Sequence, residues 1–134
     1  MNLTKKIEKT TVKALFEEDK KILLVKDHKG VWEMPGGRME NDETPEKTLK
    51  RELKEELGWE NFEIKTALEP WNFSSEVNAT QYQFTVKIYI CISHENKIME
   101  NNEYSEYRWV SIDEIDGLNM RDGYKQAIKE YIGK

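Results

Sequence analysis

The sequence contains a single cysteine, Cys91, among its 134 residues. One cysteine excludes an intrachain disulfide and a zinc site built from cysteine ligands. Cys91 lies within the apolar run 86–92. We therefore expect a buried core thiol rather than a nucleophile.

Long apolar runs and clustered positive charge are also lacking. Residues 1–10 are polar and Lys-rich, so neither a secretory signal nor a membrane span is readable, and we expect a cytoplasmic protein with no membrane partner. The formal net charge is −5. This argues against a nucleic-acid polymer as partner, because a phosphate backbone attracts clustered Lys and Arg. A small anionic substrate stays compatible with this charge if a metal supplies the positive charge.

Repeats and linkers are absent, so the length predicts a single domain spanning residues 1–134. Short runs rich in Val, Ile, Leu and aromatic residues predict strands. The pairs 10–16 with 21–26 and 62–73 with 80–92 are each joined by a polar turn, and 107–110 adds one more strand. The intervening Pro35-Gly36-Gly37 segment is expected to be irregular.

The clearest helix is predicted over 44–57. Thr44 suits the N-cap, Pro45 the first helical position, and Gly58 the position just past the end. A short helix after Ser111 and a last one over 124–132 follow from helical spacing.

The order of these elements is mostly β with helices inserted. It favours an α/β architecture in which a mixed β-sheet lies between helices, rather than a regularly alternating parallel fold.

The central helix carries two contrasting faces. Leucines recur every fourth residue and predict a stripe that faces the core. Beside this stripe, three carboxylates converge: Glu52, Glu55 and Glu56. They could be ordinary surface glutamates paired with nearby basic residues, as Glu46 could pair with Lys50. They could equally bind a cation, since Mg²⁺ takes oxygen ligands from a few carboxylates and Mn²⁺ is a feasible substitute.

A glycine loop and this helix together form one motif. It reads Gly37, five residues, Glu43, seven residues, then Arg51-Glu52-Leu53-Lys54-Glu55-Glu56-Leu57-Gly58-Trp59. This stretch resembles the signature of the Nudix hydrolases, and every strongly specified position from Gly37 to Gly58 matches. The final position, usually a branched aliphatic residue, holds Trp59, which concerns local packing and touches no ligand.

The resemblance implies a Nudix-type α/β/α sandwich with a mixed β-sheet. It makes Glu52, Glu55 and Glu56 carboxylate ligands of Mg²⁺, adds the carbonyl of Gly37, and makes Glu43, Arg51 and Gly58 structural. Many members also recruit a glutamate from a loop outside the signature as a further metal ligand. Glu103 is our candidate, with Glu106 as second choice.

The implied reaction is hydrolysis of a diphosphate bond in a nucleoside diphosphate derivative by a metal-activated water. A MutT-like member of this length would convert a nucleoside triphosphate, oxidised or not, into a nucleoside monophosphate and pyrophosphate. The general base would be Glu52 or, alternatively, Glu103. Residues beside the motif or on later elements are candidate substrate contacts: Lys26 and Arg38 for phosphate, Met34 with Trp71, Phe73 and Tyr82 for the base ring, and Asp122 for the base edge unless it is a helix N-cap.

Other functions are also compatible with the sequence. The protein could be an ADP-sugar or dinucleoside polyphosphate hydrolase, although the Pro or Tyr markers of those branches are absent past the signature. A non-catalytic nucleotide-binding module of the same fold would be expected to have lost carboxylates that this chain keeps. An isomerase acting on a prenyl diphosphate would need a catalytic cysteine and a longer chain. A monomer and a homodimer are equally compatible with the sequence.

Overall fold

Eight strands, two α-helices and one 3-10 helix form within residues 5–133, which the structure, a computed structural model, describes. The elements are β1 (Lys5–Glu18), β2 (Lys21–Lys26), β3 (Trp32–Glu33), β4 (Gly36–Arg38), α1 (Pro45–Leu57), β5 (Phe62–Ala67), β6 (Trp71–Val77), β7 (Thr80–Ser93), β8 (Glu106–Ser111), η1 (Ile112–Gly117) and α2 (Asp122–Ile132). The expected single domain also includes residues 1–4 and 134, which lie outside the described part.

The long strands β1 and β7 run parallel and form the centre of a mixed sheet. β2 and β4 pair with β1 in antiparallel orientation, β5 and β6 pair with β7, and β3 and β8 pair with β2. The predicted mixed β-sheet is confirmed.

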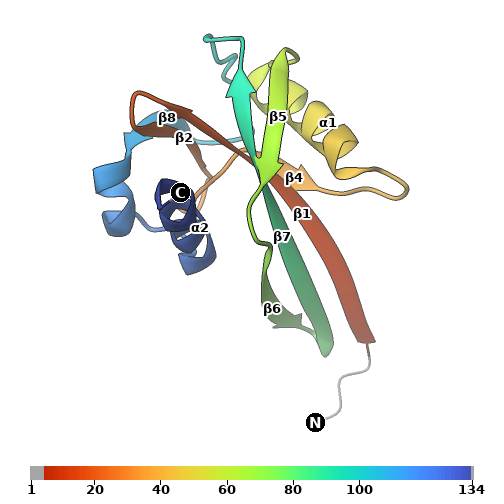
Figure 1. Ribbon diagram of the computed structural model, residues 1–134. Helices are drawn as coiled ribbons and strands as arrows, with labels where there is room; N and C mark the ends of the chain where they lie inside the picture. The colour runs from red at the N-terminus through yellow and green to blue at the C-terminus, as the bar shows by residue number, and fades with distance from the viewer. Residues whose placement is uncertain (1–4, 134) are drawn as a thin grey trace.

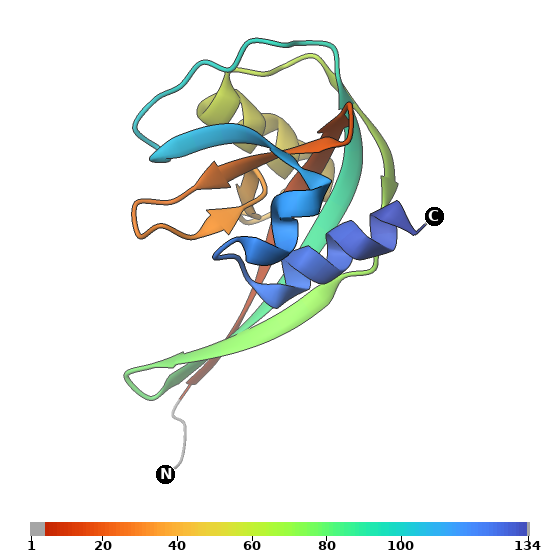
Figure 2. The ribbon, with the colours of Figure 1, turned by 90° about the vertical axis from the view of Figure 1, so that its left-hand side faces the viewer.

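Two hydrophobic clusters fill the space between this sheet and the helices. Along β1, Val12 and Ala14 belong to the cluster under α1. Leu15 points the other way, into a cluster that contains Ile128 of α2. The alternation follows from the two-residue period of a strand. Accordingly, α1 and α2 lie on opposite sides of β1 and β7 (Figure 1), and Figure 2 shows the same arrangement with α2 in front.

Helix α1 begins and ends where its local sequence predicts. The Thr44 side chain accepts a hydrogen bond from the Lys47 N–H at 3.2 Å, which satisfies one free donor of the first turn. Gly58 follows the helix at φ 74°, in the left-handed region that glycine adopts without strain. The predicted leucine stripe, Leu49, Leu53 and Leu57, is completely buried.

Trp59, the residue that departs from the signature, is also completely buried. Its ring meets Phe16 edge-on with centroids 5.1 Å apart, and its Nε1–H donates to the Lys97 carbonyl at 2.8 Å. The indole therefore fills the core at the end of α1 with its polar atom satisfied.

Cys91 is buried, as expected. Burial raises the pKa of its thiol to about 12, which keeps the sulfur protonated and unreactive at neutral pH.

Several element boundaries differ from the predictions. β1 begins at Lys5 instead of residue 10, because β7 supplies hydrogen-bond partners along its whole length. The expected strand 62–73 is two strands, interrupted around Pro70, which cannot donate to a ladder. Gly36 and Gly37 lie in β4 and pair with β1, so the segment is regular after all. Within residues 5–133, no helix is long and apolar enough to cross a membrane.

Candidate active site

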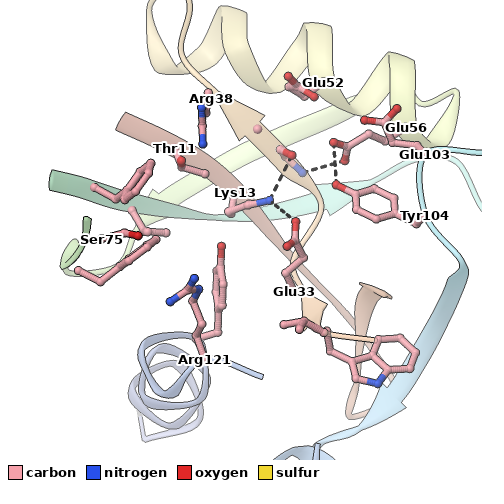
Figure 3. Close-up of a pocket in the computed structure, with 18 residues that line it drawn as sticks. Thr11, Lys13, Glu33, Arg38, Glu52, Glu56, Ser75, Glu103, Tyr104 and Arg121 are labelled. Carbon is pink, nitrogen blue, oxygen red and sulfur yellow. Dashed lines mark hydrogen bonds and ion pairs between the residues drawn. The ribbon is translucent and has the colours of Figure 1, made fainter. Parts of the chain in front are cut away.

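A cavity of about 600 Å³ opens between α1, the sheet and the start of α2. Side chains reach it from β1, β3, β4, α1, β6, β7, the loop before β8 and the segment entering α2. Figure 3 shows Glu52 and Glu56 of α1 on one side of the cavity and Arg121 on the other, with Lys13 between them.

Glu56 is the buried carboxylate of this site, with 1% of its surface exposed. Its Oε1 accepts a hydrogen bond from the Gly36 N–H and its Oε2 accepts one from the Tyr104 hydroxyl, both at 2.9 Å. Burial raises the pKa of Glu56 to about 8, although these two donors and nearby Lys13 act to lower it. The neighbouring Glu52 carboxyl adds to the increase. A second positive charge at this position would therefore be stabilising.

Lys13 is the buried cation beneath this carboxylate. Its Nζ donates to Glu33 Oε1 at 2.8 Å and to the Gly36 carbonyl at 3.2 Å. Burial alone lowers the pKa of the ammonium, but the neighbouring acidic groups of Tyr124, Glu33 and Glu56 raise it above its ordinary value. Lys13 therefore stays charged and holds the β3–β4 segment against β1.

Glu52 lies one helical turn before Glu56, and its carboxylate rests against Gly37. A Cβ atom built on Gly37 would come within 3 Å of both carboxylate oxygens of Glu52. Only a residue without a side chain allows this approach. Gly37 and the Glu52 carboxylate are therefore close enough to contribute ligands to the same metal ion.

Arg51 and Glu43 brace the loop against α1, as the signature implies. Arg51 donates from Nε to Glu43 Oε2 at 2.8 Å and from Nη2 to Glu43 Oε1 at 2.9 Å. The same Nη2 reaches the Arg38 carbonyl at 3.0 Å, and Nη1 reaches Glu52 Oε1 at 2.8 Å. The bidentate grip of Arg51 holds the pKa of Glu43 at about 2.

The third signature carboxylate, Glu55, is exposed and does not line the cavity. The three carboxylates therefore do not all converge in this structure, because Glu55 precedes Glu56 by one residue and lies about 100° around the helix from it. Across residues 5–133, no three potential ligand side chains are already grouped around one point. The pair Glu52 and Glu56 nevertheless fits Mg²⁺, which binds proteins through one or two carboxylates and leaves other positions to water and substrate phosphates.

The two loop glutamates differ in position. Glu103 lines the cavity, and its backbone N–H donates to Asn101 Oδ1 at 2.8 Å. Asn101 in turn donates to the Glu55 carbonyl at the end of α1 at 2.9 Å. Glu106, the second choice, pairs with Lys26 at 3.0 Å outside the cavity lining.

Some of the candidate substrate contacts line the cavity and others do not. Arg38 lines the cavity, whereas Lys26 does not. Met34 is completely buried in the core, so its side chain does not reach a substrate.

Asp122 lines a separate hollow beside α2, and the N-cap of α2 is Arg121, so the N-cap alternative for Asp122 is wrong. Of the proposed base-stacking aromatics, Phe73 lines the cavity, but Trp71 and Tyr82 do not.

Lys13, Tyr104, Arg121 and Tyr124 line the cavity and were not identified from the sequence. One signal was available for Lys13, because it is a lone cation inside the apolar run 10–16. The other three residues reach the cavity through contacts between segments distant in sequence.

Comparison with known proteins agrees with this geometry. A nucleoside triphosphatase NudI of Enterobacter sp. (strain 638) is 35% identical over 101 residues, which cover 69% of this chain and 70% of that protein. The NudI of Escherichia coli O139:H28 is 31% identical over 136 residues, covering 91% and 95%. A solved NUDIX hydrolase from Nitrosomonas europaea has a TM-score of 0.71 at 25% identity, covering 94% of this chain and 89% of that one. The MutT protein of Methanosarcina mazei Go1, at 23% identity over 94% of each chain, shares the fold with a TM-score of 0.74. A NUDIX domain model matches residues 8–131, and the chain belongs to the Nudix hydrolase family.

Proposed function

We propose that this protein hydrolyses a nucleoside triphosphate to a nucleoside monophosphate and pyrophosphate in a reaction that depends on Mg²⁺, with Mn²⁺ as a substitute. The observation that carries the proposal is the meeting of Glu52, Glu56 and Gly37 at one side of a nucleotide-sized cavity. The substrate class is supported by the two relatives named nucleoside triphosphatase.

In this proposal, Glu52 and Glu56 would hold the metal with the Gly37 carbonyl, and the exposed Glu55 would be a further ligand. The bound metal would lower the pKa of a water and neutralise charge on the phosphate oxygens. Arg38, at the end of β4 beside Gly37, supplies guanidinium donors for the phosphate chain. The hydrogen bonds from Arg51 to Glu43 and to Glu52 hold the loop in a fixed position relative to the Glu52 carboxylate.

For the proton of the attacking water, Glu103 is the better acceptor. The Glu52 carboxylate is already engaged by Arg51 at 2.8 Å. The Glu103 side chain lines the cavity and, within residues 5–133, has no hydrogen-bond or ion-pair partner. We therefore assign metal binding to Glu52 and proton transfer to Glu103.

A substrate panel tests this function. Nucleoside triphosphates, oxidised nucleotides, ADP-ribose and dinucleoside polyphosphates would each be incubated with Mg²⁺ or Mn²⁺, and the products separated by anion exchange. We expect monophosphate and pyrophosphate from triphosphates, and slower turnover of the other classes. Preferred cleavage of ADP-ribose or of a dinucleoside polyphosphate would contradict the substrate class, and no turnover of any compound would contradict the enzymatic function.

The assignment of the two glutamates is tested with Glu52→Gln and Glu103→Gln at saturating metal. We expect Glu103→Gln to lower turnover while the metal concentration for half-maximal activity stays the same. Glu52→Gln should raise that metal concentration. The reverse pattern would exchange their roles.

A further inference from the structure

The cavity has two ends of different chemistry. The end at α1 carries the carboxylates Glu52 and Glu56. The opposite end is formed by Arg121 and Tyr124, which border the aromatic side chains Phe73 and Phe84 (Figure 3 labels Arg121). We call Arg121 and Tyr124 the donor wall. If phosphates lie at the α1 end, as the proposed function requires, the donor wall faces the rest of the nucleotide.

Tyr124 is a buried residue whose hydroxyl lacks a protein partner. The side chain is 5% exposed and lines the cavity, yet no hydrogen bond joins its hydroxyl to any residue from 5 to 133. Its ring meets Trp71 edge-on at 5.1 Å. Trp71 in turn packs against Gly123, where a Cβ atom would collide with the indole. The hydroxyl is therefore held in place at the surface of the cavity, where it can donate a hydrogen bond to a ligand or accept one.

Arg121 is a cation without a carboxylate partner in the described chain. Its guanidinium lies over the Phe73 ring, 4.1 Å from the centroid, and forms no ion pair. Arg51 and Arg108 both pair with glutamates, whereas Arg38, which also lines the cavity, lies over the Phe84 ring at 5.3 Å. Arg121 precedes α2 as its N-cap but makes no side-chain cap. The guanidinium carries five N–H donors, and they are available to a ligand.

Phe73 stacks on Phe84 with centroids 4.7 Å apart and an interplanar angle of 19°. Arg121 lies over the Phe73 ring and Arg38 lies over the Phe84 ring at 5.3 Å, and all four residues line the cavity. A nucleobase at this end would therefore pack beside the two guanidinium groups and the rings beneath them. Arginine can only donate hydrogen bonds. The pyrimidine C4 or purine C6 position carries a carbonyl oxygen in uracil, thymine and guanine and an amino group in cytosine and adenine. With this edge of the base beside Arg121, the carbonyl accepts a hydrogen bond, whereas the amino group places donor against donor.

We propose that the donor wall selects nucleotides whose base presents a carbonyl oxygen to it: uracil, thymine or guanine in preference to cytosine or adenine. The proposal rests on the proposed function for the position of the phosphates. It adds a specificity determinant that the signature segment does not contain.

Binding of non-hydrolysable nucleotides tests the proposal separately from catalysis. The α,β-methylene triphosphates of uridine, cytidine, guanosine and adenosine would be titrated calorimetrically in the presence of Mg²⁺. We expect uridine to bind about tenfold or more tightly than cytidine, and guanosine than adenosine, as a hydrogen bond to a charged group implies. In Arg121→Met, the affinities for uridine and cytidine should differ by no more than about twofold, and so should those for guanosine and adenosine. Tyr124→Phe should reduce each difference in part, since both substitutions remove hydrogen-bond donors from the donor wall.

Arg108→Met is the matched control, because Arg108 also lies over an aromatic ring, Trp32, at 5.0 Å but does not line the cavity. It should leave both ratios unchanged. Arg121→Lys, which keeps the charge but not the fork, should give intermediate ratios and also shows whether the position tolerates substitution.

Equal affinities in the wild-type protein would overturn the proposal, while turnover of triphosphates would still support the proposed function. If Arg121→Met weakened all four analogues equally, Arg121 would be a phosphate contact, which also overturns it. A carbonyl preference in binding without any hydrolysis would support the donor wall and contradict the proposed function.

Discussion

Replacing Gly37 by alanine should damage catalysis while leaving the fold intact. A methyl group at this position would lie 2.7 Å from Glu52 Oε2 and nearer still to Oε1 and the carboxyl carbon. Ordinary contact begins at 3.4 Å, so the carboxylate must move by about 1 Å. The obstacle is the end of a flexible side chain, and the φ of Gly37 is not in the left-handed region. The free energy of unfolding should therefore fall by less than about 1 kcal/mol.

Activity should respond far more strongly, because a displacement of about 1 Å in a catalytic group can cost on the order of 100-fold in rate. The assay measures kcat and the metal dependence of turnover, with thermal unfolding in parallel. Gly117→Ala is the control, since nothing lies within 4 Å of a Cβ at that glycine. If Gly37→Ala kept kcat within about twofold of the wild type, the placement of Glu52 against Gly37 would not matter for catalysis.

Two further predictions concern the scaffold. Gly36→Ala should destabilise the fold by about 2–4 kcal/mol in urea unfolding, because the new Cβ meets the Val12 backbone and φ is 135°; a loss below about 1 kcal/mol would refute this packing. The pKa of Glu43 is lowered to about 2 from 4.5, so its pairing stabilises the fold above about pH 4.5, and this contribution is lost as the pH falls toward 2. Glu43→Gln should therefore flatten the decline of the urea midpoint over that range, and an unchanged slope would show that the Arg51 brace does not contribute.

Local sequence signals were sufficient to predict α1. Thr44, Pro45 and Gly58 mark its ends with residues whose preferences depend on the adjacent backbone alone, and the structure has those ends. The parallel pairing of β1 with β7 could not be predicted from local pattern, because it joins segments about 75 residues apart. For the same reason the polar start of β1 was not recognised as a strand.

The site was predictable where it lies within one segment. The spacing of Glu52 and Glu56 placed both on one face, but only tertiary packing determined that Glu56 is buried while Glu55 stays exposed. Packing also brings Tyr104 to Glu56, 48 residues away, and Lys13 to Glu33, 20 residues away. A helix wheel carries no information about such partners.

The most direct test of the central claim is to follow triphosphate hydrolysis by ³¹P NMR in the wild type, in Glu56→Gln and in Glu46→Gln, a matched control on the first turn of α1. The account predicts equal amounts of nucleoside monophosphate and pyrophosphate from the wild type and from Glu46→Gln, and a rate at least about 100-fold lower from Glu56→Gln. Release of nucleoside diphosphate and phosphate, or undiminished turnover by Glu56→Gln, would contradict it.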